Sequence, residues 1–342
     1  MFYTEYVDIA KVITHEVGNK VAATGYSMSD VLTGTGELQR MYLLNICIEP
    51  FEDEGTLQFF HPSSLGCNLV YESVRQIFDN PDRFINISQN LARHLYDVTV
   101  GINDKGGLLV VVYFNNFIID GDTVDAVGIF KCEKKGMVLS GIPNNNDNGI
   151  DFDLVKGISS YDKGCLVFNK ERDNGFVVYA FEETGKPRQS ELWFSDFLDV
   201  VKRADSYNCT EAMMRFASKF IKQDIPSKFE ASTNDIAEIL ERAKLFFKEE
   251  DFFYNDQYFH DVLKQDDIIE LWRERVEAME DPLLSLEEFH LSGRAVKRYL
   301  RKFDFDIVLD GKTKINRDND LESGEDDRGK YIKIYYKQQT VK

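Results

Sequence analysis

The sequence is short of the residues that build disulfide frameworks, zinc sites and membrane spans. Its 342 residues include five cysteines, and no two of them form a C-x-x-C pair. An odd number of widely spaced cysteines predicts reduced thiols in the cytoplasm. The first residues include acids and lack the apolar core of a secretion signal, and no apolar run approaches the roughly 20 residues that span a bilayer. We therefore expect a cytoplasmic protein with no membrane partner.

Motifs of the common enzyme classes are also missing. The five histidines are scattered, and none belongs to an H-E-x-x-H motif or to another paired metal-ligand spacing. There is no Walker loop and no G-x-S-x-G motif. Gly34 and Gly36 lack the preceding strand and the third glycine of a dinucleotide-binding turn. These absences predict a protein that is not an enzyme and that has no catalytic residue, metal or cofactor.

One acidic set leaves a hydrolytic alternative open. Carboxylates and a lysine could be placed near a magnesium ion, as in nucleases that use divalent metals, by the set Asp120, Asp122, Asp125, Lys131 and Glu133. Aspartate is also favoured in turns for local hydrogen bonding, and the lysine and glutamate alternate on one strand face as an exposed pair would. A metal-dependent nuclease is therefore the least favoured of three functions.

Negative charge dominates the chain, but its distribution is uneven. The net charge is −18, with 43% hydrophobic and 29% charged residues, which is typical of a globular protein. Residues 291–342 hold 13 Lys and Arg against 9 Asp and Glu, so the remainder carries −22. Screening over about 8–10 Å at cellular salt allows a local cationic patch to act despite a distant acidic body. The C-terminal part is thus the part expected to attract a polyanion.

A basic stretch, LSGRAVKRYLRK, begins at Leu291 and contains five cations and no acid. At about 100° per residue, its apolar residues fall on one side of a helix and its cations on the other. The expected apolar face is Ala295, Val296, Tyr299, Leu300 and Phe303. The expected DNA-binding residues of this helix are Arg294, Lys297, Arg298, Arg301 and Lys302. Each cation placed near a phosphate releases a condensed counterion, although a solvated face on a packed helix remains an alternative.

The order of periodicities predicts an α+β fold. N-terminal helices, including Ser29–Ile48, precede an antiparallel β meander that begins at Leu108. A helical middle region follows, and the chain ends in the basic helix and a small antiparallel sheet. We expect three parts: an α+β domain at 1–202, a helical region at 203–290, and the basic helix with three strands at 291–342.

The basic helix sits in a pattern that resembles a helix-turn-helix followed by a β-hairpin wing. Leu283–His290 is expected to be a short helix, LSG a turn, and Ser292 the cap of the second helix. Lys312 and Lys314 on the hairpin and Lys333 on the last strand would extend the DNA-binding surface. Phosphate contacts position a protein without specifying bases, so no sequence preference follows.

Three segments elsewhere are distinctive in their sequence and in their order along the chain: VGIFKCE at Val127–Glu133, DKGCLVFN at Asp162–Asn169, and WFSDFLDV at Trp193–Val200. With LARHLY at Leu91–Tyr96 and the basic C-terminal part, they resemble the bacterial nucleoid-associated protein family of the NdpA or YejK type. The resemblance implies a cytoplasmic protein at the nucleoid, acting on DNA or on DNA-bound partners, with no established catalysis and no cofactor. Gly128 and Gly164 of these segments are expected to allow close packing or turns.

The sequence thus favours a nucleoid-associated protein that binds DNA, double-stranded by expectation, through its C-terminal basic surface. An alternative is an acidic interaction protein that recruits or regulates DNA-handling proteins at the nucleoid. A homodimer is a further expectation, because a modest patch gains reach when it is doubled.

Overall fold

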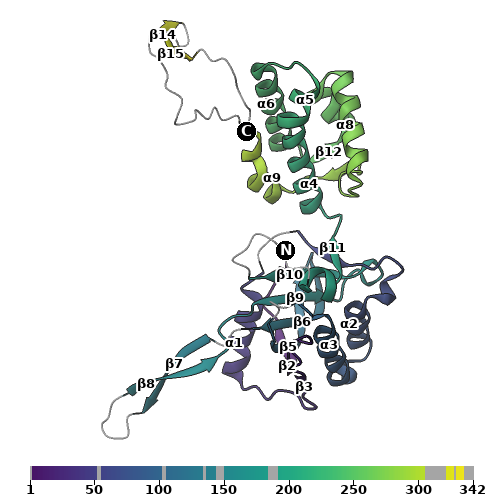
Figure 1. Ribbon diagram of the computed structural model, residues 1–342, viewed down its shortest axis with the longest axis vertical. Coiled ribbons are helices and arrows are strands. Elements are labelled where there is room, and N and C mark those ends of the chain that lie inside the picture. The colour runs from purple at the N-terminus through teal and green to yellow at the C-terminus, as the bar shows by residue number, and fades with distance from the viewer. Residues whose placement is uncertain are drawn as a thin grey trace. The chain divides into compact units, whose positions relative to one another are not determined.

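The structure, a computed structural model, describes residues 2–51, 55–101, 105–133, 136–143, 150–183, 192–304, 321–326 and 329–334. The chain forms two compact units, Met1–Arg203 and Ala204–Lys342 (Figure 1). The α+β class predicted from the sequence is confirmed. The finer division into three parts, with 291–342 as a part of its own, stays a prediction.

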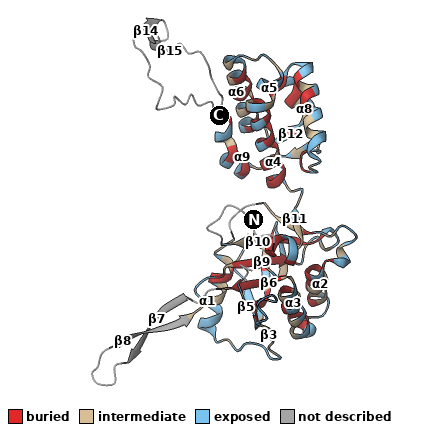
Figure 2. Cartoon of the chain, viewed as in Figure 1, coloured by how far each residue is buried: buried red, intermediate tan, exposed pale blue. Residues whose placement is uncertain are grey.

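The first unit is built on a nine-stranded sheet in the order β11-β4-β10-β9-β6-β5-β2-β3, with β1 beside β5. Every neighbouring pair of its strands is antiparallel. The central strands are buried on both faces, as Figure 2 shows in red. Its strands are β1 Phe2–Tyr3, β2 Asp8–Val17, β3 Tyr26–Ser27, β4 Leu57–Phe59, β5 Gly107–Ile119, β6 Asp122–Cys132, β9 Lys163–Phe168, β10 Val177–Glu182 and β11 Val200–Lys202.

Helices cover both faces of this sheet. On one face α2 (Leu69–Asp79), α3 (Phe84–Val98) and a π-helical turn at Leu192–Phe197 share a core with the sheet. On the other face α1 (Glu37–Ile48) packs through Ile46 and Cys47. Short 3-10 turns lie at Leu65–Cys67, Pro81–Arg83 and Arg172–Asn174.

Local chemistry explains where these elements begin and end. The side chain of Asn68 accepts a hydrogen bond from the backbone N–H of Tyr71 and so caps α2. The α2 helix ends at Asp79, before Asn80 and Pro81, as the sequence predicts. Asp120 and Gly121 both have positive φ, 51° and 85°, which is the geometry of a tight hairpin turn between β5 and β6.

The two glycines of the distinctive segments lie under aromatic rings. A methyl group at Gly128 would lie 2.5 Å from a ring carbon of Phe130 and 2.8 Å from one of Phe114. A methyl group at Gly164 would lie 2.5 Å from Phe181 and 2.8 Å from Phe130. The expected close packing is therefore present at both positions, because any side chain would displace a buried ring.

Strands β7 (Gly136–Pro143) and β8 (Ile150–Gly157) pair with each other as a separate antiparallel ribbon. The sequence predicts a strand at Met137–Ser140 but not the return strand β8. The polar residues Pro143–Gly149 predict a loop, and all of them after Pro143 lie outside the described residues.

The second unit packs its helices around Trp272, whose ring meets Phe216, Phe220 and Tyr258. Two small antiparallel sheets accompany the helices. The helical elements are α4 Ser206–Lys219, α5 Ile225–Lys228, α6 Thr233–Glu249, α7 Asn255–Tyr258, α8 Asp266–Met279 and α9 Gly293–Tyr299, with π turns at Phe220–Asp224 and Phe259–Leu263 and a 3-10 turn at Leu300–Phe303. The strands are β12 Phe252–Tyr254, β13 Glu288–His290, β14 Leu321–Asp326 and β15 Gly329–Ile334.

Three sequence predictions about individual elements are wrong. The helix expected from Ser29 begins at Glu37, because Gly36 holds an extended conformation at its N-cap. The helix expected at Leu283–His290 is not formed, since Glu288–His290 is strand β13 and pairs with β12. The acidic, polar residues Asp318–Gly329 predict a loop, but strand β14 lies within this range. Within the described residues, none of the helices is long and apolar enough to cross a membrane.

Candidate nucleic-acid interface

The basic helix α9 is fixed at its start by three hydrogen bonds. The backbone N–H of Leu291 donates to the carbonyl of Asp251 at 2.8 Å, and that of Ser292 donates to Thr210 Oγ1 at 2.9 Å. The Ser292 side chain caps the helix by accepting from the N–H of Ala295. The predicted capping role of Ser292 is thereby confirmed, and α9 starts in a defined place on α4.

The apolar side of α9 lies in the core of the second unit, as its periodicity predicts. Ala295, Tyr299 and Phe303 are 0%, 7% and 2% exposed. Val296 and Leu300 are partly buried and pack against the same core.

All five cations of this stretch lie on its exposed side. Each of them falls in the exposed class: Arg294, Lys297, Arg298, Arg301 and Lys302. The burial of one face and the exposure of the other give the segment the amphipathic arrangement expected from the sequence.

Two of the arginines are held against aromatic rings. The guanidinium of Arg294 lies 5.7 Å from the ring centroid of Tyr207. Arg298 donates to the hydroxyl of Tyr207 at 3.3 Å and lies 5.9 Å from the ring centroid of Tyr299. Such contacts reduce the number of conformations of a long side chain while its charge stays at the surface. These two arginines are therefore partly oriented before any ligand arrives.

The ion pairs of this unit join other groups. In the described residues of this unit, the pairs of lysine and arginine are Arg215–Glu211, Arg242–Glu238, Lys244–Asp304 and Arg275–Asp224, and His260 Nδ1 lies 2.6 Å from Asp261. Among the described residues, no carboxylate lies within 4.0 Å of the charged nitrogen atoms of Lys297, Arg301 or Lys302. These three cations are consequently available to an external anion.

The end of the basic segment is tied to α4 and α6. Ser218 Oγ donates to the carbonyl of Lys302 at 2.7 Å, and Lys244 Nζ donates to Asp304 Oδ1 at 2.6 Å. Lys222 Nζ donates to the carbonyl of Asp304 at 3.0 Å. The hydrogen bond from Lys244 is the main reason that the pKa of the Asp304 carboxyl lies below its ordinary value.

The structure gives less support to the other three predicted DNA-binding residues. Lys312 and Lys314 lie outside the described residues. Lys333 is in β15, where the register places it opposite Glu322 of β14. The same register places Lys330 opposite Glu325. Both lysines of β15 therefore have an acid as cross-strand neighbour, and with Asp326 the two strands hold three acids against two lysines, so the pair has no net positive charge.

The helix-turn-helix interpretation of this region is wrong. The residues before α9 form β13 instead of a first helix, and α9 packs on α4. The cations are thus presented from the side of a helix, with no second helix arranged across the backbone as in that motif.

The acidic set considered for a nuclease is not brought together. Asp120 and Asp122 lie at the hairpin turn, where Lys170 Nζ is 3.5 Å and 2.9 Å from their carboxylates. Asp125 accepts a 2.8 Å hydrogen bond from the hydroxyl of Tyr113. Lys131 and Glu133 are at the far end of β6 and just beyond it. In the described part of the chain, no three His, Cys, Asp or Glu side chains are grouped so as to hold a metal ion.

Lys131 and Glu133 belong to a buried ionic cluster instead of the exposed pair expected from the sequence. Lys131 is 1% exposed, and its Nζ lies 3.2 Å from Glu133 Oε1. Lys163 Nζ lies 2.6 Å from Glu133 and 3.0 Å from Glu182. Asp162, the neighbour of Lys163, accepts from the backbone N–H of Glu133. Sequence reasoning missed Glu182, which reaches the cluster only because β9 and β10 pair.

Pairing decides the charge state of this cluster. Burial disfavours the ionised form of Glu133, but the hydrogen bond and charge of Lys163 and the charge of Lys131 outweigh it, so the pKa of Glu133 is lowered. Burial likewise disfavours the charged Lys163, but Glu133 and Glu182 outweigh it and raise its pKa. Buried charges of this kind remain ionised only when they are paired. The distinctive GIFK-x-E and DKG segments therefore meet in a structural ion cluster.

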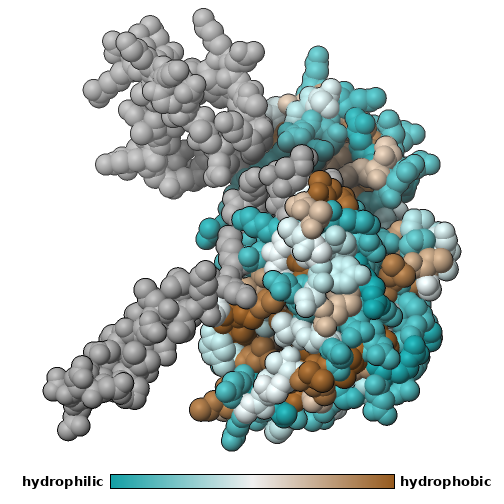
Figure 3. Space-filling model, turned by 60° about the horizontal axis from the view of Figure 1, so that its bottom comes forward, coloured by the Kyte–Doolittle hydropathy of each residue, from teal (hydrophilic) through white to brown (hydrophobic). Residues whose placement is uncertain are grey.

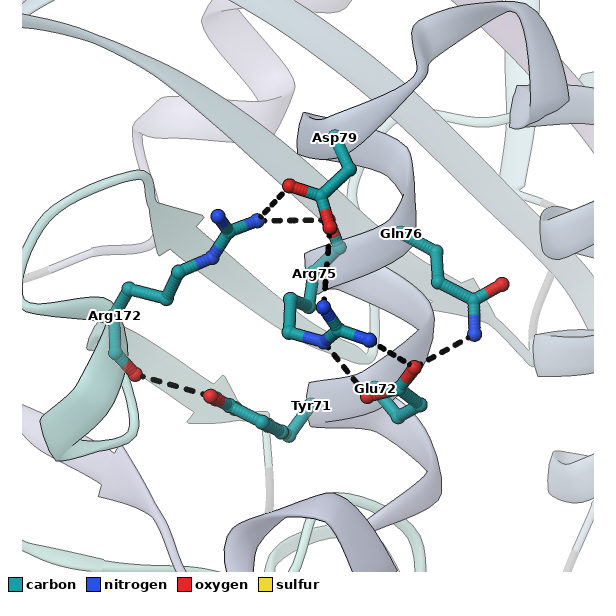
Figure 4. A network of polar contacts seen from close by, with 6 residues as sticks. All are labelled: Tyr71, Glu72, Arg75, Gln76, Asp79 and Arg172. Carbon is teal, nitrogen blue, oxygen red and sulfur yellow. Dashed lines mark hydrogen bonds and ion pairs between the residues drawn. The ribbon is translucent and has the colours of Figure 1, made fainter.

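Two arginines of the first unit are also committed to carboxylates (Figure 4). Arg172 Nη2 lies 2.6 Å from Asp79, and Arg75 bridges Asp79 and Glu72 at 3.2 Å and 2.6 Å. The hydrogen bond from Arg75 lowers the pKa of Glu72. This network joins α2 to the turn after β9. Both of its arginines are paired with carboxylates, so neither is an isolated cation at the surface.

The molecule is thus an α+β protein with an acidic body and a buried ion cluster in its sheet unit. Its helical unit holds the helix α9, whose exposed side carries cations and no acid. The family model described as nucleoid-associated protein YejK matches residues 13–341. The chain belongs to this family of nucleoid-associated proteins, as the sequence resemblance predicts. No curated protein sequence matches the chain.

Proposed function

We propose that this nucleoid-associated protein binds double-stranded DNA directly, through the cations of the segment Arg294–Lys302. The observation that supports this most is their shared exposure on one side of a segment whose other side is buried. The apolar side fixes the helix, so the cations have a common direction. The function is that of a non-enzymatic cytoplasmic protein at the nucleoid.

The charge distribution of the chain determines how strongly, and at what range, it would attract DNA. The acidic body repels a phosphate backbone, whereas the five cations attract it at distances shorter than about 8–10 Å. A single short segment neutralises few phosphates, so binding is expected to be moderate and strongly salt-dependent. Phosphate contacts alone give no sequence preference.

The test is an electrophoretic mobility shift titration with a fluorescent duplex at several salt concentrations. It compares the wild-type chain with a variant in which Arg294, Lys297, Arg298, Arg301 and Lys302 are replaced by Gln. The control replaces five other exposed lysines, so that the net charge changes equally: Lys105, Lys219, Lys228, Lys248 and Lys264. We expect the first variant to lose DNA binding and the control to keep most of it. Equal losses in both variants would assign the attraction to net charge instead of to this segment.

A second candidate function is that of an interaction protein that brings DNA-handling proteins to the nucleoid. It is favoured by apolar side chains at the surface of the first unit, some of which Figure 3 shows in brown. Leu38 and Met41 of α1 are 79% and 60% exposed, and Val31 before it is 72% exposed. Clustered exposed apolar residues are typical of protein contact surfaces. Under this function, purified protein leaves DNA unshifted and shifts it only when a DNA-binding partner is added.

A homodimer fits either function, because two copies would present two cationic segments to one duplex. Sedimentation equilibrium of the full chain measures the mass directly. A single species with the mass of one chain at micromolar concentration would rule out the homodimer.

A further inference from the structure

The helical unit has a second surface whose chemistry is opposite to that of the basic helix. A cleft of about 800 Å³ lies between α8, the segment Tyr254–Phe259, and the segment Leu284–Glu288 that leads into β13. Neither α9 nor its cations line it. Clefts of about 300–1,000 Å³ are of the size that encloses small molecules or a few residues of a peptide.

The floor of the cleft is aromatic and rigid. Trp272 is 2% exposed and Phe259 is 7% exposed, and both line the cleft. Trp272 is held by edge contacts with Phe216 at 4.6 Å and Phe220 at 5.1 Å. The guanidinium of Arg273 lies 5.2 Å from the ring centroid of Phe259. Phe259 therefore already makes a contact with a cation of the chain itself, which is the kind of contact that an aromatic ring offers to a lysine or arginine.

The rim of the cleft is acidic. Asp256, Glu277, Glu287 and Glu288 line it and are exposed, and Arg273 is the one cation among the described lining residues. The surrounding sequence, residues 251–290, contains 12 Asp and Glu against 3 Lys and Arg. This concentration of negative charge repels a phosphate backbone and raises the local concentration of cationic groups.

A buried acceptor in the lining lacks a donor. Asn255 Oδ1 is buried and receives no hydrogen bond from any described residue, while the backbone N–H of Asn255 is held by the carbonyl of Glu287 at 3.0 Å. An unpaired buried acceptor costs free energy that an incoming N–H donor recovers. Ammonium and guanidinium groups are donors without acceptors, so they match this oxygen as well as the acidic rim.

We propose that this cleft binds a short lysine- or arginine-containing segment of a protein partner. The aliphatic part of the bound side chain lies on Phe259 and Trp272, and its charged end meets the carboxylates of Glu287 and Glu288. The site goes beyond DNA binding: it gives the helical unit a protein-binding surface separate from α9, and its occupation does not require that α9 binds DNA.

The probe is a fluorescein-labelled octapeptide that alternates lysine and alanine, with a glutamate and alanine peptide as its negative counterpart. Binding to the full chain is measured by fluorescence anisotropy at about physiological salt. The cleft variant is Glu287→Gln with Glu288→Gln. The matched control is Glu241→Gln with Glu249→Gln, which removes two exposed charges of α6 that do not line the cleft.

We expect the cleft variant to bind the lysine peptide about fivefold to tenfold more weakly and the control to bind within about twofold of wild type. Asn255→Leu removes the buried acceptor at similar volume and is expected to weaken peptide binding without lowering the unfolding temperature. Equal losses in the cleft and control variants would overturn the proposal, because they would reflect net charge alone. The proposal would also be overturned if the wild-type chain did not change the anisotropy of the lysine peptide.

Two further arms separate the alternatives. Spermine that displaces the peptide at an equal concentration of charge would overturn the assignment to a protein segment and favour a polyamine. The DNA mobility shift of the cleft variant is expected to equal that of wild type, so a failure of the DNA-binding proposal leaves the peptide measurement interpretable.

Discussion

The hydroxyl of Tyr299 in α9 donates a 2.6 Å hydrogen bond to the carboxylate of Glu211 in α4. Arg215 completes the contact, since its Nε lies 2.8 Å from Glu211 and its guanidinium lies 4.8 Å from the ring centroid of Tyr299. Burial, followed by the hydrogen bond to Glu211, raises the pKa of Tyr299 to about 12. The basic helix is thus attached to the rest of its unit by a polar contact as well as by its apolar face.

Tyr299→Phe tests this attachment. The variant keeps the ring but removes the donor, so the free energy of unfolding is expected to fall by about 1–3 kcal/mol. Urea denaturation followed by circular dichroism measures the change. Tyr254→Phe, on an exposed residue, is the control and is expected to stay within about 0.5 kcal/mol of wild type. A Tyr299 variant as stable as the control would contradict a stabilising role for the bond.

The three cations with no described carboxylate within 4.0 Å of their charged nitrogen atoms give a sharper DNA experiment. Lys297→Gln, Arg301→Gln and Lys302→Gln together leave Arg294 and Arg298 on their tyrosines. We expect the slope of log affinity against log salt to become shallower by about 2–3, since each phosphate that the variant no longer neutralises reduces it by about 0.9. Lys219→Gln, Lys248→Gln and Lys264→Gln change the net charge equally and are expected to keep the wild-type slope. An unchanged slope in the first triple variant would place the phosphate-binding cations elsewhere.

The buried ion cluster predicts a large effect from a small change. Glu133→Gln leaves the buried Lys131 and Lys163 with less compensation, so the free energy of unfolding is expected to fall by about 3 kcal/mol. Asp122→Asn, at an exposed pair with Lys170, is expected to cost less than about 1 kcal/mol. The unfolding transition of the first unit, followed by thermal and urea denaturation, measures the loss of stability in each of the two variants. Similar decreases in the free energy of unfolding would show that the cluster stabilises the fold no more than a surface ion pair does.

The same cluster gives a pH dependence of known sign. The pKa of Glu133 is lowered in the folded chain, so its stabilisation is present above the ordinary glutamate pKa and is lost as pH falls through the lowered value. Wild type is therefore expected to lose stability in acid more steeply than Glu133→Gln. Parallel stability curves for the two proteins below pH ~4.5 would contradict this linkage.

His15 is expected to contribute to a second pH range, together with His94, whose pKa burial also lowers. Its Nδ1 accepts from the N–H of Ser29 at 3.1 Å, and its Nε2 lies 2.9 Å from Ser88 Oγ, which itself donates to the carbonyl of Ile85. The ring is therefore neutral, with its proton on Nε2. Burial lowers its pKa from 6.5 to about 4.

The unfolded chain therefore binds the proton of His15 first as pH falls, and stability declines between pH 6.5 and about 4. The total loss is roughly 3 kcal/mol. His15→Gln is expected to flatten this part of the stability curve, whereas His260→Gln, on an exposed ring, is expected to leave it unchanged. Urea denaturation at pH 7 and pH 5 measures both. A wild-type curve that is flat over this range would refute the assignment.

The parts of the site that follow from local periodicity were predictable. Ala295, Tyr299 and Phe303 recur at a spacing of four residues, and this spacing alone places them on one buried face. The cap at Ser292 is equally local. Both features depend on neighbours within one or two helical turns, which is the range that a sequence pattern records.

The features that depend on distant partners were not predictable. Glu288–His290 has the apolar and polar mixture of a short helix, but pairing with Phe252–Tyr254 makes it a strand. Glu182 meets Lys163 only across β9 and β10. The cleft of the helical unit is formed by segments up to about thirty residues apart, so no spacing in the sequence indicates it.

The rings that cover Gly128 and Gly164 have a consequence for which substitutions this chain can accept. Both glycines lie in the interior of the sheet, where an added methyl group would lie 2.5 Å from an aromatic ring carbon. The surface proposed to meet phosphate belongs to the other unit, and no such steric veto operates on its exposed lysines and arginines. Substitutions among the exposed cations of Arg294–Lys302 would therefore change the charge of the proposed surface without the clashes that a methyl group at either glycine would cause.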